Sequence, residues 1–352
     1  MRYEHGGDIY TNEYRLDFSS NINPFGMSED VRLAAANSMK QASAYPDSRC
    51  RRFKSALAEK LGISEKWIIA GNGAADLIFS LVFAVRPKRG LILAPAFLEY
   101  EQALKSADCR TVVYERPKEL DFTVDKRFIK VLEAELKQGL DLVFLCSPDN
   151  PTGGLIRKDI LEEALKLCDR YGSLLVVDES FYEFAFAGES ETMLPKIEET
   201  KSLVIIRSFT KMYGMPGLRL GYGISSDSRL IERMKMVRQP WSVSIPAQEA
   251  GIAALKTEGW TGMVRNYVKK QRVWLQEQLT ELGFRVYPSS ANYLLFYTDR
   301  KLMEPLKEQG ILIRDCSNYR GLTEGYYRVA VKKEDENEEL IRALYGICSE
   351  NG

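Results

Sequence analysis

Short apolar segments alternate with longer helical segments through the middle of the chain. Seven segments have the length and the uninterrupted apolar character of buried strands: residues 67–70, 90–94, 111–114, 142–146, 174–177, 203–206 and 220–224. Helical segments such as 98–107, 126–138 and 157–171 separate them. Strands without apolar and polar alternation are expected where helices cover both faces of a mostly parallel sheet. The sequence therefore predicts an α/β fold with a large, mostly parallel seven-stranded sheet.

The pattern changes near residue 245, and the ends of the chain differ from its middle. A long helical stretch, 247–282, is followed by four short strand-like segments and two further helices, as expected for a smaller α+β domain. The 352 residues also exceed the usual size of one hydrophobic core. The sequence predicts an N-terminal arm (1–26) that packs with the small domain, a large domain (27–245) and a small C-terminal domain (246–352).

Composition narrows the classes of protein that the chain can belong to. Acidic and basic residues number 49 each, so no global field favours nucleic acid or an anionic membrane. No apolar run reaches the roughly 20 residues of a membrane span, and the first residues lack the apolar core of a secretory signal. Six cysteines are scattered without CxxC pairs, and one histidine cannot form a His-rich metal site. These features predict a cytoplasmic protein with reduced cysteines and no metal.

One glycine, one aromatic residue and three polar residues follow five of the predicted strands. They are Gly73, Phe97, Asn150, Asp178 and Lys211. Because the carboxyl ends of parallel strands lie at one edge of a sheet, where ligands bind, we expect these residues to share one site.

The residues from 178 to 219 match the requirements of one cofactor, pyridoxal phosphate. Asp178 would keep the pyridine nitrogen protonated, Lys211 would bind the cofactor covalently, and Ser208 with Arg219 would hold the phosphate. Singly, an Asp-Glu pair after a strand is more often a helix cap, and a lone lysine or arginine is usually solvated. The order and spacing of all four residues favour the cofactor site.

The ordered set Asn150-Pro151-Thr152-Gly153, Asp178-Glu179 and Ser208-x-x-Lys211 resembles the fold-type I pyridoxal-phosphate enzymes of the aminotransferase class I/II group. The resemblance implies that Asn150 contacts the ring hydroxyl. It also implies that Tyr45 reaches the cofactor phosphate of a neighbouring subunit, so that a homodimer shares its active sites. The remaining residues implied to bind the cofactor are Gly73, Ala74, Ala75, Phe97, Asp178, Ser208, Lys211 and Arg219.

Within this group the chain looks closest to decarboxylases of L-threonine O-3-phosphate from cobalamin biosynthesis, with histidinol-phosphate aminotransferases as near relatives. His5-Gly6-Gly7 and residues 311–319 carry this resemblance. Aminotransferases of the group usually have a tyrosine that bonds the ring oxygen where this chain has Phe181, and Tyr182 is displaced by one position. The resemblance therefore implies a decarboxylase.

Two arginines on successive apolar segments, Arg314 and Arg328, predict a doubly acidic substrate. By resemblance, Arg328 grips the substrate α-carboxylate. The substrate phosphate would contact some combination of His5, Asn23, Arg314 and Arg328. Without the resemblance, we would interpret His5 as a solvent-exposed residue of a flexible terminus.

Three other functions compete with decarboxylation. A histidinol-phosphate-type aminotransferase uses the same motifs, and the sequence cannot show which bond at the substrate α-carbon stands perpendicular to the cofactor ring. A non-catalytic pyridoxal-phosphate-binding regulatory module is less favoured, because no DNA-binding domain fits in the 26 residues of the N-terminal arm (1–26). A degenerate scaffold is disfavoured by the presence of Lys211, Asp178 and Arg219.

Overall fold

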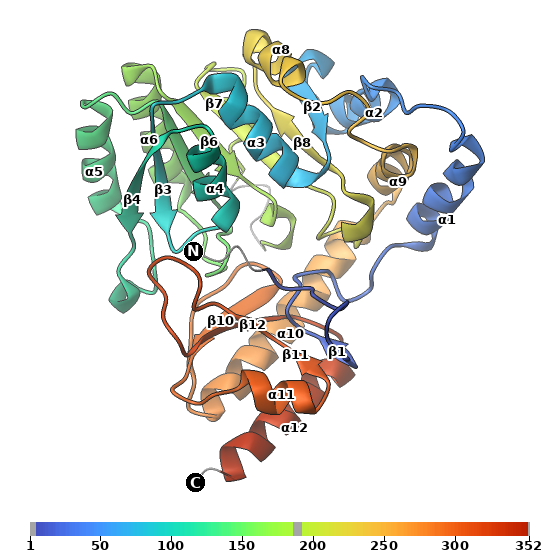
Figure 1. Ribbon diagram of the computed structural model, residues 1–352, viewed down its shortest axis with the longest axis vertical. Coiled ribbons are helices and arrows are strands. Elements are labelled where there is room, and N and C mark those ends of the chain that lie inside the picture. Colours follow the sequence, from blue (N-terminus) through green and yellow to red (C-terminus); the bar gives the residue numbers. More distant parts are fainter. Residues whose placement is uncertain (1–4, 186–191, 351–352) are drawn as a thin grey trace.

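A computed structural model describes residues 5–185 and 192–350 of the chain. Its larger sheet has seven strands in the order β2-β8-β7-β6-β5-β3-β4, which confirms the predicted α/β fold (Figure 1). All neighbours pair in parallel except β8, which is antiparallel to β2 and β7. The strands are β2 (Ile68–Gly71), β3 (Arg89–Ala94), β4 (Arg110–Glu115), β5 (Leu142–Cys146), β6 (Leu174–Asp178), β7 (Leu203–Ser208) and β8 (Gly221–Ile224).

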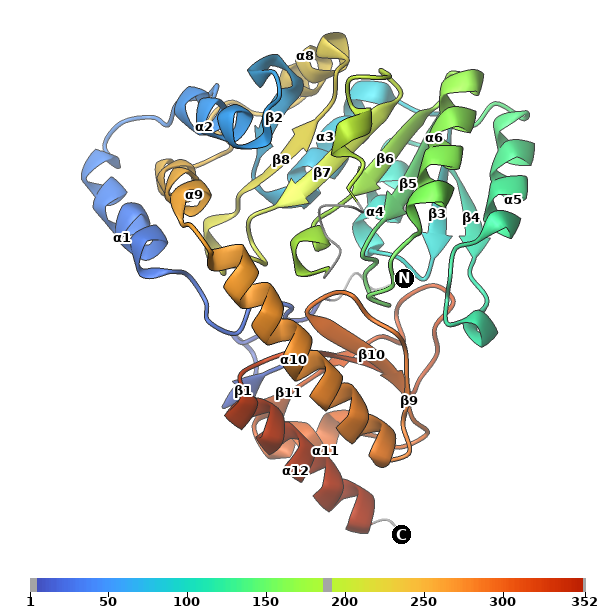
Figure 2. The same cartoon turned by 180° about the vertical axis from the view of Figure 1, so that it is seen from behind.

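Helices cover both faces of this sheet, so the strands are buried on both sides. One core packs under α3 (Gly73–Val85), α4 (Leu98–Ser106) and α8 (Ser228–Met236), and it takes Leu142 and Phe144 from β5. The other core takes Val143 and Leu145 of the same strand. This alternation is the side-chain period of two in a strand. The helices of the second face are α2 (Arg51–Leu61), α5 (Lys126–Leu136), α6 (Lys158–Tyr171) and α9 (Ile245–Lys256) (Figure 2).

A smaller antiparallel sheet, in the order β12-β13-β10-β9, lies below the carboxyl ends of the large sheet (Figure 1). The N-terminal segment joins this part of the molecule, because β1 (Leu16–Asp17) pairs in parallel with β11 (Ile311–Leu312). The domain boundaries at residues 26 and 245 stay predictions. The remaining elements are α1 (Glu29–Ser38), α10 (Trp260–Glu281), β9 (Arg285–Val286), β10 (Tyr293–Tyr297), α11 (Met303–Glu308), β12 (Arg314–Asp315), β13 (Tyr326–Ala330) and α12 (Glu334–Glu350).

The prediction of a single long helix over residues 247–282 is wrong. The structure divides it into α9, which packs against α1 and α2, and α10, which carries the chain to the smaller sheet (Figure 2). The break is at Gly259, whose φ of +70° is a left-handed conformation that interrupts a right-handed helix. Hydrophobic periodicity alone did not show this break, because both α9 and α10 have buried residues at helical spacing.

All six cysteines carry free thiols, and five of them are buried. No helix in the described part of the chain is long and apolar enough to span a membrane.

Two glycines offer a test of the packing between α9 and the large sheet. A Cβ at Gly251 in α9 would lie 2.4 Å from Leu220 Cδ2 and 2.8 Å from the Phe53 ring, whereas a Cβ at Gly346 in α12 would meet nothing within 4 Å. We expect Gly251→Ala to lower the free energy of unfolding by about 1–3 kcal/mol through overpacking. Gly346→Ala should instead raise it by roughly 0.5–1 kcal/mol, because alanine favours the helix. Urea denaturation followed by circular dichroism measures both, and equal effects of the two variants would contradict the packing.

Candidate active site

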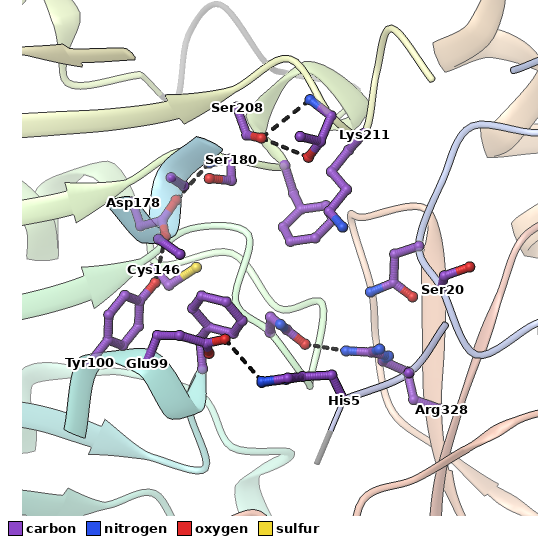
Figure 3. Close-up of a pocket in the computed structure, with 18 of the residues that line it drawn as sticks. His5, Ser20, Glu99, Tyr100, Cys146, Asp178, Ser180, Ser208, Lys211 and Arg328 are labelled. Atoms are coloured by element: carbon purple, nitrogen blue, oxygen red, sulfur yellow. Dashed lines mark hydrogen bonds and ion pairs between the residues drawn. The ribbon is translucent and has the colours of Figure 1, made fainter. Parts of the chain in front are cut away.

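A cavity of about 330 Å³ opens at the carboxyl ends of the central strands of the large sheet (Figure 3). Side chains from the large sheet, the smaller sheet and the N-terminal segment all line it. Ten of the residues predicted from the sequence are among them: His5, Ala74, Ala75, Phe97, Asn150, Asp178, Ser208, Lys211, Arg219 and Arg328.

Asp178 ends β6 with a carboxylate that is only 3% exposed. Tyr100 donates its hydroxyl to Oδ2 at 2.6 Å, and the Ser180 backbone N–H donates to Oδ1 at 2.9 Å. Burial raises the pKa of Asp178, while the bonds from Ser180 and Tyr100 oppose the rise. Both donors are neutral, and no described residue forms an ion pair with this carboxylate. A protonated ring nitrogen placed against it would supply the missing positive charge.

Lys211 lies in the turn that follows β7, and its side chain points into the cavity (Figure 3). Its Nζ is 6.0 Å from the centre of the Phe181 ring. The pKa of this amine is lowered to about 8, mainly by burial and also by the charges of Arg328 and Arg219, against a smaller opposing effect of Glu99. The neutral, nucleophilic amine is therefore accessible near physiological pH.

The start of α3, the end of β7 and Arg219 form a cup suited to a phosphate group. Ala74 and Ala75 belong to the first turn of α3, whose backbone N–H groups favour an anion. The hydroxyls of Ser208 and Thr210 lie 2.7 Å apart beside them. Gly73 has a φ of +79°, which favours glycine, and a Cβ there would lie 2.5 Å from Arg219 Nη2, so the guanidinium closely approaches the start of α3.

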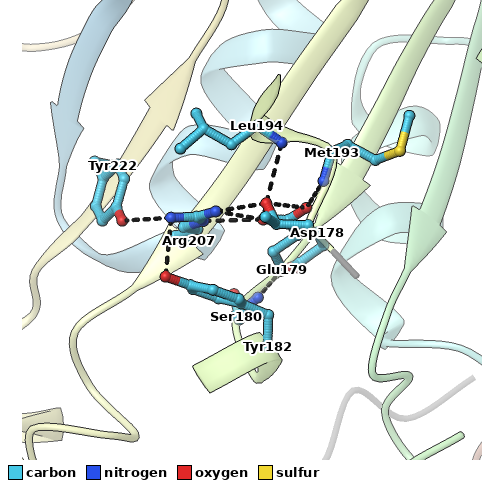
Figure 4. Close-up of polar contacts among 9 residues, drawn as sticks. Asp178, Glu179, Ser180, Tyr182, Met193, Leu194, Arg207 and Tyr222 are labelled. Atoms are coloured by element: carbon cyan, nitrogen blue, oxygen red, sulfur yellow. Dashed lines mark hydrogen bonds and ion pairs between the residues drawn. The ribbon is translucent and has the colours of Figure 1, made fainter. Parts of the chain in front are cut away.

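Behind the cavity, a buried ion pair joins the ends of β6 and β7 (Figure 4). Arg207 donates to Glu179 Oε2 from Nε at 2.9 Å and from Nη2 at 2.8 Å. Glu179 also accepts from the Thr192 hydroxyl, and Arg207 also donates to the Tyr182 hydroxyl. Because neighbouring residues of a strand face opposite ways, Glu179 and Arg207 stabilise the strand ends that present Asp178 and Ser208 to the cavity.

Arg328 links the smaller sheet to the large one. It lies on β13 with 5% exposure, donates Nη1 to Asn150 Oδ1, and donates Nη2 to the Ser19 carbonyl at 3.1 Å. Its Nε is buried without a hydrogen-bond partner in the described part of the chain. The buried Arg116–Asp149 ion pair, at 2.8 Å, holds the turn that contains Asn150.

Phe181 and Tyr182 face different surroundings. Phe181 lines the cavity, whereas Tyr182 lies against Arg207, whose guanidinium carbon is 3.9 Å from the tyrosine ring centre. The displaced tyrosine therefore does not reach the cavity that Phe181 lines.

Four of the predicted site residues lie outside the cavity lining. Gly73 packs against Arg219, as described above. Asn23, predicted to meet a substrate phosphate, donates its amide at 2.9 Å to the carbonyls of Met212 and Gly26, so it holds the turn of Lys211 instead. Arg314 is buried beside Tyr319 and donates to Asn318 Oδ1 at 2.8 Å. Tyr45 is 79% exposed and stacks on Trp241 at 4.5 Å between ring centres.

Other lining residues carry chemistry that the sequence did not reveal. Tyr100 and Glu99 lie in the first turn of α4, directly after Phe97, where a tyrosine and a glutamate looked like ordinary helix residues. The expectation that residues after the strand ends share one ligand site, which located Phe97, could have drawn attention to them. The further lining residues are Gly6, Ser19, Ser20, Asn21, Cys146, Ser180, Thr210 and Tyr319.

Known proteins are similar to this chain in both sequence and fold. The model of the aminotransferase class I and II family matches residues 14–344. The chain is 34% identical to the threonine-phosphate decarboxylase of Salmonella typhimurium, over 98% of this chain and 96% of the relative. It is 33% identical to histidinol-phosphate aminotransferase 2 of Archaeoglobus fulgidus, over 94% and 92%. The crystal structure of the histidinol-phosphate aminotransferase from Clostridium acetobutylicum matches with a TM-score of 0.88 and 31% identity, over 96% of this chain and 100% of that chain.

The strand order, the smaller domain and the site at the strand ends define a fold-type I pyridoxal-phosphate enzyme. The chain belongs to the aminotransferase class I and II family, whose cofactor is pyridoxal 5'-phosphate. Within that family it is an enzyme of the branch that contains threonine-phosphate decarboxylases and histidinol-phosphate aminotransferases. The residues present fit the cofactor, because the buried Asp178 carboxylate, the Lys211 amine and the phosphate cup all face one cavity.

The buried pair behind the site leads to a prediction about stability. Arg207→Met would leave Glu179, 2% exposed, without its cationic partner. We expect the free energy of unfolding to fall by about 3–5 kcal/mol. Arg157→Met, which breaks the exposed ion pair with Asp159, should cost only about 0–1 kcal/mol. Denaturant unfolding measures both variants, and a loss at Arg207 no larger than at Arg157 would contradict this assignment.

The pKa of Lys211 leads to a second prediction for the site. Only the neutral amine attacks an aldehyde, so we expect the rate at which the cofactor-free protein gains visible absorption with pyridoxal phosphate to rise through a pH of about 8. Stopped-flow absorbance against pH measures the midpoint. Lys211→Ala is the control and should show no such absorption. A midpoint near the ordinary lysine value of 10.5 would show that the amine is not perturbed.

Proposed function

We propose that this protein decarboxylates L-threonine O-3-phosphate to (R)-1-amino-2-propanol O-2-phosphate, as in cobalamin biosynthesis. The bond between the α-carbon and the carboxylate breaks, CO₂ leaves, and a proton takes its place on the α-carbon. The 34% identity to a threonine-phosphate decarboxylase over nearly the full length of both chains supports the proposal.

The observation that carries this choice is Phe181. Aminotransferases of the group usually have a tyrosine at that position, which bonds the oxygen of the cofactor ring. Here a phenylalanine lines the cavity, and the neighbouring Tyr182 hydroxyl accepts a hydrogen bond from Arg207 at 3.0 Å on the other side of the chain. A site without that ring bond resembles the decarboxylases of the branch.

Arg328 is the residue proposed to bind the substrate carboxylate. Its guanidinium is held by Asn150 and by the Ser19 carbonyl, its Nε is buried without a partner among the described residues, and the residue lines the cavity. An arginine fixed on two sides can orient a carboxylate through a fork of donors. Which bond of the α-carbon then stands perpendicular to the cofactor ring decides between decarboxylation and transamination.

Pyridoxal phosphate supplies an electron sink for the bond that breaks. Asp178 keeps a positive charge on the ring nitrogen, because its buried carboxylate is stabilised by a cation at hydrogen-bond distance. Lys211 is protonated below its lowered pKa of about 8, and its ammonium group can give a proton to the α-carbon after CO₂ has left. Ser208, Arg219 and the first turn of α3 hold the cofactor phosphate in this proposal.

The substrate phosphate would lie toward His5 and Arg314. His5 lines the cavity, and Arg314 is close enough for its charge to lower the pKa of His5, after the larger effect of burial.

A homodimer with shared active sites is part of the same proposal. The exposed Tyr45–Trp241 stack lies outside the cavity of its own chain, where it is free to meet a neighbouring subunit.

A histidinol-phosphate-type aminotransferase is the second candidate. The fold match to the Clostridium acetobutylicum enzyme, with a TM-score of 0.88, favours it. Purified protein loaded with pyridoxal phosphate distinguishes the two functions. We expect CO₂ release from L-threonine O-3-phosphate, and little glutamate from histidinol phosphate with 2-oxoglutarate. Glutamate formation without CO₂ release would overturn the proposal in favour of the aminotransferase.

The role proposed for Arg328 is testable by a conservative change. A lysine keeps the charge but cannot form a two-pronged contact, so Arg328→Lys should raise the KM for L-threonine O-3-phosphate by about tenfold or more. Arg285→Lys, on β9 of the same sheet and exposed to solvent, is the matched control and should leave the KM unchanged. Steady-state kinetics of both variants measure this difference. Equal KM values for Arg328→Lys and the unmodified protein would remove Arg328 from the substrate site.

A further inference from the structure

Glu99 is a buried carboxyl group in the cavity that the reaction described above does not use. It occupies the first turn of α4, two residues after Phe97, and lines the same cavity as Lys211 and Asp178 (Figure 3). Asp178 has a place in the proposed cofactor site, whereas Glu99 has none. A carboxylate in a cavity built for anionic ligands needs a physical explanation.

The contacts of Glu99 connect the N-terminal segment to the large sheet. Its Oε1 lies 3.3 Å from His5 Nε2, and its side chain is 12% exposed while that of His5 is 49% exposed. Its Oε2 is buried without a hydrogen-bond partner among the described residues. One oxygen of Glu99 therefore contacts His5 beside the cavity, and the other has no hydrogen-bond partner among the described residues.

The charged and titratable groups around this pair come from several elements. Arg314 on β12, Arg328 on β13 and Lys211 after β7 bring positive charge toward His5. Asp178 at the end of β6 adds negative charge near Glu99, and Tyr319 is close enough for Glu99 to affect its pKa. The cations favour a second anionic group of a ligand here, and an ionised Glu99 would oppose it.

Burial also moves the two partners toward each other in pKa. The pKa of Glu99 is raised to about 7, mainly by burial and also by Asp178, although the Glu99 backbone hydrogen bond, Lys211 and Arg314 act in the opposite direction. Burial lowers the pKa of His5, and Arg314, Arg328 and Lys211 lower it further. Near neutral pH the two side chains can therefore hold one proton between them.

We propose that Glu99 is a specificity-determining residue that takes up a proton when the dianionic group of a ligand binds beside His5. A protonated Glu99 can donate a hydrogen bond from its second oxygen to a phosphate-like group, whereas an ionised one repels that group. This rests on the proposed function for the identity of the substrate, but its test uses no turnover.

The sign of the pH dependence follows from the charge that is added. A bound dianion favours the protonated form of Glu99, so binding takes up a proton and weakens as pH rises above about 7. Glu99→Gln keeps the shape and the hydrogen-bonding capacity of the side chain but cannot ionise. The variant should lose this part of the pH dependence and bind a dianion more tightly than the unmodified protein at alkaline pH.

Sulfate is a suitable probe, because its charge stays fixed from about pH 6 to about pH 9 while the protein groups titrate. Protein loaded with pyridoxal phosphate is titrated with sulfate by calorimetry in two buffers of different ionisation enthalpy. We expect proton uptake near pH 7.5 to fall to about half or less in Glu99→Gln, and sulfate to bind about tenfold more tightly than to the unmodified protein at about pH 8.5. Glu101→Gln is the matched control, because Glu101 lies on the same helix but pairs with Arg320 and Lys105 outside the cavity. It should leave proton uptake unchanged.

Equal proton uptake by Glu99→Gln and the unmodified protein would overturn the proposal. Tenfold weaker sulfate binding by Glu99→Gln at every pH would also overturn it, by showing that Glu99 acts only as a support for His5. If Glu99→Gln does not fold, Glu99→Asp replaces it and should shift the pH dependence of sulfate binding, and an unshifted dependence counts against the proposal. Lack of CO₂ release from L-threonine O-3-phosphate would leave these binding results unaffected, so the two proposals can fail separately.

Discussion

The buried ion pair between Glu179 and Arg207 is the interaction on which the geometry of the site depends. It joins the ends of two adjacent parallel strands at the point where β6 and β7 leave the sheet. Asp178 and Ser208 are the immediate neighbours of these residues and face the opposite way, into the cavity. A charged pair with several hydrogen bonds thus fixes the strand ends while leaving their other face free for ligand chemistry.

The cavity is complete only where distant parts of the chain meet. The large sheet contributes Asp178 and Lys211, the smaller sheet contributes Arg328, and the N-terminal segment contributes His5 and the carbonyl that Arg328 binds. Strand β1 pairs with β11, so backbone hydrogen bonds hold this segment in addition to the contact of Arg328 with the Ser19 carbonyl. In the proposed function, substrate contacts and cofactor contacts would therefore come from opposite sides of one cavity.

The accumulation of positive charge in this cavity has a direct chemical consequence. Arg219 and Arg328 lower the pKa of Lys211 beyond the effect of burial, so that a neutral amine is available near physiological pH. The same cations suit a cofactor phosphate, a carboxylate and a second anionic group of a substrate. The charges that lower the pKa of Lys211 are thus the same charges that would attract anionic ligands.

The sequence by itself determined the sheet, the carboxyl-end position of the site and ten of the residues that line the cavity. Apolar strand segments and strand-end residues are local patterns, and parallel topology brings their ends together, which made Asp178, Asn150 and Lys211 predictable. Only the tertiary structure decided the break at Gly259, the use of Asn23 to hold a turn, and the entry of Glu99 and Tyr100 into the cavity. Those outcomes depend on backbone conformation and on contacts between residues far apart in the chain, which hydrophobic periodicity and motif spacing do not encode.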